Sequence, residues 1–181
     1  MAAILYAQFR SYDIKELVTR LNEGYYNALD IMCLNAHNCI GQLQEDDQHP
    51  SVVLYTSIYS ALLTEIQDLL LFRRDVILPY LEELIAKSEA GHNCKECSGK
   101  CHVGHNVHLM SLKNSHDKIK DVLAELQSST LPLHMDVEYP AAYRILRNEI
   151  AVIDNMLIEL FYIEESSLIP KVMETQKSIN A

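Results

Sequence analysis

The chain has 181 residues, 49% of them hydrophobic and 22% charged, a composition typical of a globular protein, and we expect a single domain over 1-181. Its net charge of −10 argues against nucleic acid as a partner, because phosphate binding requires a clustered Lys and Arg surface. No apolar run approaches the roughly 20 residues of a membrane helix, and MAAILYAQFRSYD lacks the features of a signal peptide. We therefore expect no membrane partner. The odd total of five cysteines suits reduced thiols or a metal site and predicts a cytoplasmic location.

Apolar residues recur every three or four positions without sustained alternation, so the sequence predicts an all-α protein. The first helix is expected to begin after Asp13, a residue type that caps helix N-termini, and to run to about Leu43. Its expected apolar stripe is Ile14, Leu17, Leu21, Ala28, Met32 and Cys39. The second helix is expected to have Pro50 in its first turn. Its expected stripe, up to Pro79, is Leu54, Ile58, Leu62, Ile66, Leu69, Arg73 and Ile77.

A polar loop at about 90-108 is expected to separate the second helix from the third. The stripe of the third helix is Leu109, Leu112, His116, Ile119, Leu123 and Leu126. The fourth helix is expected to begin near Tyr139, with Pro140 in its first turn. Its stripe, up to Pro170, is Tyr143, Leu146, Ile150, Ile153, Leu157, Leu160, Glu164 and Leu168. Long helices joined mostly by short connections predict an up-down-up-down four-helix bundle.

Three polar side chains interrupt these stripes: Arg73, His116 and Glu164. A buried charge costs several kcal/mol without a partner, so they should contact one another or a metal, unless the stripes are displaced by one position and all three reach solvent. When Pro79 is aligned with Pro170, Arg73 falls on Glu164, which indicates an internal repeat with opposite charges. We favour a core ion pair of Arg73 and Glu164, helped by His116 or a tyrosine hydroxyl.

Three short segments resemble the hemerythrin-like HHE bundle, most closely its iron–sulfur cluster repair branch. The segments are IEESSLIPK at Ile163 to Lys171, SHD at Ser115 to Asp117 and QHP at Gln48 to Pro50. In that family a half-motif of His-x-x-x-Glu, followed by a Leu-Phe-Pro stop, occurs twice. The resemblance extends over roughly Asp13 to Gln176 and implies a four-helix bundle whose relatives hold a di-iron centre.

By this resemblance, His116 and Glu164 keep the residue type of a family iron ligand. The other ligand positions fall on Leu69, Arg73, Leu160, Tyr25 with Tyr26, and Asp46 or Glu45. An arginine at a bridging-carboxylate position would add a positive charge beside two metal cations. The resemblance therefore implies vestigial ligand positions, no metal in the bundle core, and the Arg73–Glu164 ion pair in place of the metals.

The loop HNCKECSGKCHVGHNVH, from His92 to His108, holds three cysteines and four histidines. Thiolates of Cys94, Cys97 and Cys101 with an imidazole could bind one tetrahedral zinc ion, and an iron–sulfur cluster is a weaker choice. The imidazole ligand is left open among His92, His102, His105 and His108. A redox disulfide between Cys94 and Cys97, or no role, are the alternatives. Cys33 and Cys39 are expected to be small buried hydrophobic residues.

These patterns predict a degenerate hemerythrin-like protein that acts as a binding or sensing scaffold rather than as an enzyme, with zinc or redox chemistry at the loop. A protein partner or a homodimer is left open. The alternative is an iron–sulfur cluster repair or NO-stress protein with an unconventional iron site formed by His116, Glu164, Tyr25 and Asp46. A zinc-binding regulatory module is the third hypothesis.

Overall fold

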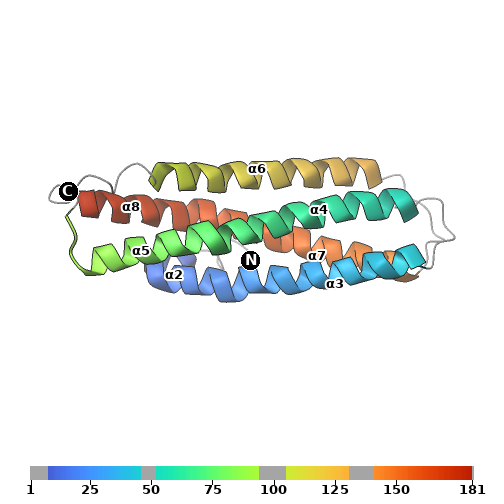
Figure 1. The fold of residues 1–181 in the computed structure, drawn as a ribbon, viewed down its shortest axis with the longest axis horizontal. Coiled ribbons are helices and arrows are strands. Elements are labelled where there is room, and N and C mark those ends of the chain that lie inside the picture. Colours follow the sequence, from blue (N-terminus) through green and yellow to red (C-terminus); the bar gives the residue numbers. More distant parts are fainter. Residues whose placement is uncertain (1–7, 46–51, 94–104, 131–140, 181) are drawn as a thin grey trace.

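The computed structural model describes residues 8–45, 52–93, 105–130 and 141–180 (Figure 1). Its elements are α2 (Ile14–Leu21), η1 (Asn22–Tyr26), α3 (Asn27–Glu45), α4 (Val52–Phe72), η2 (Arg73–Ile77), α5 (Leu78–Glu89), α6 (His105–Thr130), α7 (Ala141–Ile163), η4 (Glu164–Leu168) and α8 (Ile169–Asn180). The symbol η marks a π-helical segment, in which backbone hydrogen bonds span five residues instead of four. These ranges contain no strand, so the all-α prediction is confirmed for them.

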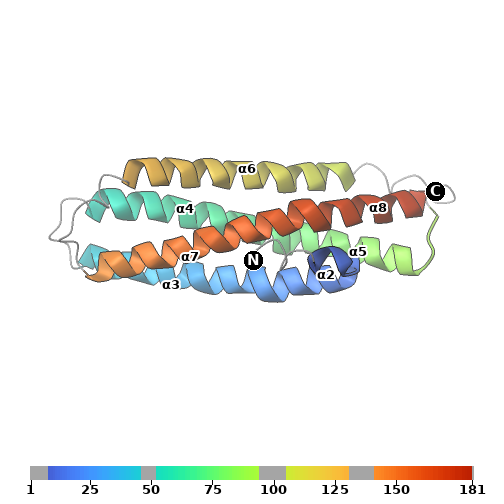
Figure 2. The same ribbon diagram turned by 180° about the vertical axis from the view of Figure 1, so that it is seen from behind.

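The helices join into long rods that lie side by side along the molecule (Figures 1 and 2). The rods are α2–η1–α3, α4–η2–α5, α6, and α7–η4–α8. The α3 helix contacts α4 and α7, α4 also contacts α6, and α5 contacts α2 and α8. The core therefore lies in the space that the rods enclose. Within the described ranges, no helix is both long and apolar enough to span a bilayer.

The first rod begins where the sequence predicts. Asp13 is the N-cap of α2, and its Oδ1 accepts a hydrogen bond from the backbone N–H of Glu16 at 2.8 Å. An acceptor at this position satisfies one of the free donors of the first turn and stabilises a helix by about 1 kcal/mol. The same rod ends at Glu45, close to the predicted Leu43. The predicted start of the second helix at Pro50 lies outside the described residues, and α4 begins at Val52.

The apolar stripe predicted for α3 is wrong by one position. The buried residues are Leu29, Cys33, Ala36, Ile40 and Leu43, whereas Ala28, Met32 and Cys39 are only half-buried. The cause is η1, because a π-helical turn contains an extra residue and rotates the following helix relative to an uninterrupted α-helix. Cys33 is therefore a buried hydrophobic residue as expected, but Cys39 is not fully buried.

The predicted stripe of α4 is correct from Leu62 onward and wrong at its start. Leu54 is 47% exposed and Ile58 is half-buried. Successive steps of four residues advance about 40° around a helix, so three steps back from Ile66 leave the buried face. That face is occupied instead by Val52, Tyr55 and Tyr59. The stripes of α6 and of α7 with η4 are buried throughout, except that Leu109 is half-buried.

The two prolines do not end their rods. Pro79 and Pro170 are the second residues of α5 and α8, which continue to Glu89 and Asn180. The π-helical segment before each proline has already changed the pattern of backbone hydrogen bonds from four residues to five. Leu78 N–H bonds to Arg73 O, and Ile169 N–H bonds to Glu164 O. An altered ladder accommodates a residue without an N–H. Both η2–α5 and η4–α8 have the same lengths and are offset by 91 residues, which supports the internal repeat.

Candidate functional site

Three π-helical segments and α6 bring a set of polar side chains into the middle of the apolar core. Tyr26 is the last residue of η1, Arg73 is the first of η2 and Glu164 is the first of η4. His116 projects from the centre of α6. Arg73, Glu164 and His116 are fully buried and Tyr26 is 3% exposed. Because π-helical turns concentrate at functional sites, this cluster, here called the charge network, is the candidate site.

Glu164 is the centre of the charge network. Its Oε1 accepts hydrogen bonds from Tyr26 OH at 2.7 Å and from Arg73 Nε at 3.3 Å. Its Oε2 accepts a hydrogen bond from Arg73 Nη2 at 2.9 Å and also contacts His116 Nε2. Arg73 therefore holds the carboxylate through two parallel bonds, the strongest geometry for this kind of ion pair. Each oxygen of Glu164 has two partners.

Arg73 also contacts the third rod. Its Nη1 donates a hydrogen bond to Ser115 Oγ at 2.8 Å, and the Ser115 hydroxyl donates in turn to the backbone carbonyl of Leu112 at 2.6 Å. The guanidinium thus joins the second rod to the third through Ser115 and to the fourth through Glu164. A rigid planar fork suits this task better than the point charge of a lysine.

His116 lies between two carboxylates. Its Nε2 contacts Glu164 and its Nδ1 lies 2.9 Å from Glu165 Oε1, while the ring stacks on Phe161 at 4.2 Å between centroids. An ionised carboxylate accepts hydrogen bonds and does not donate them, so each of these contacts requires an N–H on the ring nitrogen that faces it. Lys120 Nζ donates to Glu165 Oε1 at 3.1 Å from the solvent side. Arg73 and His116 therefore lie beside Glu164 inside the core, and His116 and Lys120 lie beside Glu165.

Burial and charge act in opposite directions on the pKa of Glu164. Burial by itself raises the pKa of this carboxyl, but the charge of Arg73 and the hydrogen bond and charge of His116 outweigh it and lower the pKa to about 2. Burial, followed by the negative charge of Glu164, raises the pKa of the Tyr26 phenol well above its usual value. At neutral pH, Glu164 is therefore ionised and Tyr26 is a neutral hydrogen-bond donor.

The residues of the charge network do not fit a di-iron centre of the kind that the relatives hold. A bridging carboxylate must offer its oxygens to two cations, but both oxygens of Glu164 are bonded to Arg73, Tyr26 and His116. The preceding helical turns present buried Leu69 and Leu160, which are not ligands. Among the described residues, no group of three or more His, Cys, Asp and Glu side chains is suited to a metal ion.

The structure separates the two adjacent tyrosines. Tyr26 reaches Glu164, whereas Tyr25 is half-buried and donates to Glu159 Oε2 at 3.4 Å. Tyr25, which the resemblance places at a ligand position, is thus not bonded to Glu164. Asp46 lies outside the described residues. Ser115 and Glu165 were not predicted, and the signal available for both was their position beside His116 and Glu164 in the sequence.

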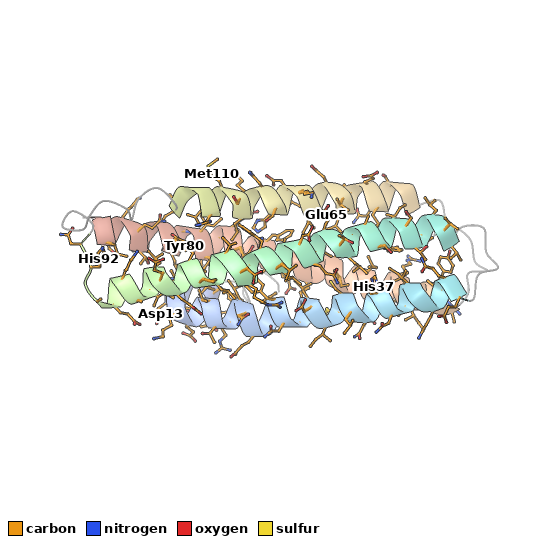
Figure 3. The ribbon with its side chains drawn as sticks, in the orientation of Figure 1. Asp13, His37, Glu65, Tyr80, His92 and Met110 are labelled. Atoms are coloured by element: carbon orange, nitrogen blue, oxygen red, sulfur yellow. The ribbon has the colours of Figure 1, made fainter. Side chains whose placement is uncertain are left out.

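The predicted loop site lies largely outside the described residues. Cys94, Cys97, Cys101 and His102 lie outside the described residues, as does the side chain of His105. His92 follows α5 at the end of the molecule (Figure 3), is half-buried, and its backbone N–H bonds to the carbonyl of Lys87 at 3.0 Å. A zinc site at this loop stays a prediction.

No protein-family model, curated protein or solved structure matches this chain. The resemblance to the hemerythrin-like proteins stays a hypothesis based on three short sequence segments.

Proposed function

We propose that the chain is an iron-free, hemerythrin-like protein with an up-down-up-down four-helix bundle, and that it acts as a binding or sensing scaffold rather than as an enzyme. The observation that supports this proposal is the ion pair of Arg73 with both oxygens of Glu164 in the fully buried core. The two residues occupy equivalent places in the internal repeat, first in η2 and first in η4. In this proposal opposite charges replace the cations that bind to paired carboxylates in the relatives.

The charge network would give the scaffold a defined core. A buried ion pair adds little net stability compared with a well-packed apolar core, but it penalises every arrangement in which a charge loses its partner. Rotation of any one rod about its axis would separate one of these side chains from its partner. The reason is that the four rods contribute one residue each: Tyr26, Arg73, His116 and Glu164. A core aligned in this way leaves the outer surfaces for a protein partner or a second copy of the chain.

Metal analysis with a visible absorption spectrum tests this proposal. The chain, purified after expression with added iron, is expected to contain far less than one iron per molecule and to lack the absorption of an oxo bridge. This expectation follows from the possible ligand atoms, since Glu164 already bonds to Arg73 and His116, and the second ring nitrogen of His116 already contacts Glu165. Two irons per chain with oxo-bridge absorption would overturn the proposal and support the cluster-repair or NO-stress alternative.

The loop carries a separate part of the proposal, namely one zinc ion bound by Cys94, Cys97, Cys101 and a histidine. Its support is the density and spacing of ligands in the sequence, together with the odd total of five cysteines, which suits reduced thiols in a cytoplasm. One zinc per chain, released on alkylation of the three thiols, is the expected result. A chain whose three loop thiols react freely without any zinc release would remove this part and leave the core proposal intact.

A further inference from the structure

A cavity of about 180 Å³ lies between α4 and α6. One face of α4 contributes Glu65, Asp68, Leu69 and Phe72, and one face of α6 contributes Ser111, Ser115, Lys118 and Ile119. Figure 3 labels Glu65 on α4, on the side that faces α6. Of the ligand positions that the resemblance gives within the described residues, only Leu69 lines this cavity, and it is not a ligand.

The inner wall of the cavity is apolar. Leu69 and Ile119 are buried, and Phe72 is half-buried beside them. Apolar protein cavities of about 150 Å³ lined by Leu, Ile and Phe admit a molecule the size of benzene. The cavity between α4 and α6 is therefore large enough for one small ring or a branched alkyl group.

The polar atoms around this wall are mainly acceptors. Ser115 Oγ donates its hydrogen to Leu112 O and accepts from Arg73 Nη1, so its remaining capacity is a lone pair. Asp68 is exposed at the cavity and has no ion-pair or hydrogen-bond partner within the described ranges. A ligand that satisfies these groups must donate hydrogen bonds.

The charges at the edge of the cavity favour a cation. Lys118 Nζ lies 2.6 Å from Glu65 Oε2, so these two charges compensate each other across the edge and leave the carboxylate of Asp68 as the uncompensated charge. The net charge of −10 for the whole chain adds a long-range attraction for cations and a repulsion for anions.

We propose that the cavity between α4 and α6 binds a small organic amine, with its apolar body against Leu69, Phe72 and Ile119 and its ammonium group paired with Asp68. The site stands on this cavity and not on the charge network, so it goes beyond the metal-free scaffold. Ser115 lines the cavity and also accepts a hydrogen bond from Arg73, so a ligand in the cavity would lie next to the buried ion pair.

Titration of the full chain with three probes of equal size tests the proposal. Benzylammonium, benzyl alcohol and benzoate carry positive, zero and negative charge on the same ring. Amide chemical shifts of α4 and α6 are expected to saturate with benzylammonium at the lowest concentration and with benzoate at the highest. Asp68→Asn is expected to weaken benzylammonium binding about fivefold, the effect of one partly exposed charge pair, and to leave benzyl alcohol binding unchanged. Asp121→Asn removes an exposed charge elsewhere on α6 and is the matched control.

A second variant addresses the volume. Ser111→Leu places a larger side chain in the cavity and is expected to abolish binding of all three probes, whereas Ser128→Leu, at an exposed position on the same helix, is expected to leave it intact. Equal affinity for benzylammonium and benzoate, or an unchanged affinity in Asp68→Asn, would overturn the proposal. Metal content decides the scaffold proposal separately, so either proposal can fail while the other stands.

Discussion

Replacement of Arg73 by leucine is the most direct perturbation of the charge network. The substitution removes both hydrogen bonds from the guanidinium to Glu164 and the bond to Ser115. Glu164 keeps Tyr26 and His116 as partners but loses the nearest cation at a position with no exposure to solvent. The carboxylate must then stay ionised with less compensation or take up a proton, and either outcome costs free energy.

The expected loss of unfolding free energy is about 3 kcal/mol. Removal of one partner from a buried ion pair costs about 3–5 kcal/mol, and the contact that His116 retains with Glu164 places this case near the lower end. For a domain of this size each kcal/mol corresponds to about 2–4 °C, so the melting temperature should fall by roughly 6–12 °C.

Urea denaturation and thermal melts of four proteins measure this effect: the wild type, Arg73→Leu, Arg74→Leu and the double variant Arg73→Leu with Glu164→Leu. Arg74 is the matched control, because its pair with Asp30 at 2.6 Å is about half exposed and should contribute no more than about 1 kcal/mol. The double variant should recover part of the loss, since no carboxylate remains buried without its cation. Equal losses in Arg73→Leu and Arg74→Leu would refute the charge-network interpretation.

Two further predictions concern the charge network, and a third concerns the buried thiol of Cys33 on α3. Because the pKa of Glu164 is lowered to about 2 in the folded chain from an ordinary 4.5, its ionisation stabilises the fold above pH 4.5, and that stability is lost as the pH falls toward 2. Denaturation at a series of pH values measures the difference in unfolding free energy between the wild type and Glu164→Gln. This difference should shrink by about 3 kcal/mol as the pH falls from about 5 to about 2. A difference that stays constant over this range would contradict the prediction. Tyr26→Phe removes a buried hydrogen bond to a charged group and should cost about 1.5–3 kcal/mol in urea, whereas Tyr25→Phe should cost clearly less; the reverse order would show that Tyr25 is the network residue. Burial raises the pKa of the Cys33 thiol to about 12, so mass spectrometry should find Cys33 unmodified after alkylation of the native chain at pH 8, and rapid labelling would show that α3 opens there.

The rods could be predicted wherever a single α-helical period runs without interruption. The stripes of α6 and α7 agree with the sequence pattern almost residue by residue, because apolar spacing along one helix records directly which face is buried. The N-cap role of Asp13 could be predicted for the same local reason, since an N-cap contacts only the first turn of its own helix. The prediction of Arg73, His116 and Glu164 as polar residues on apolar faces has the same local origin.

The apolar spacing of the sequence did not predict that the rods continue past Pro79 and Pro170. Proline usually ends or kinks a helix, and only the π-helical turn before each proline makes continuation acceptable. The same kind of turn at η1 shifts the buried face of α3 by one residue, so that Cys33 and not Cys39 is fully buried.

The sequence by itself determined the helical class, the buried faces of the uninterrupted helices and the presence of charges on those faces. Only the tertiary structure decided which partners those charges take: Tyr26 rather than Tyr25, and Ser115 and Glu165 as additional contacts. The reason is geometric, because a partner depends on how neighbouring rods are rotated about their axes. That rotation is set by the π-helical turns and by packing between rods, and neither is encoded in the period of one helix.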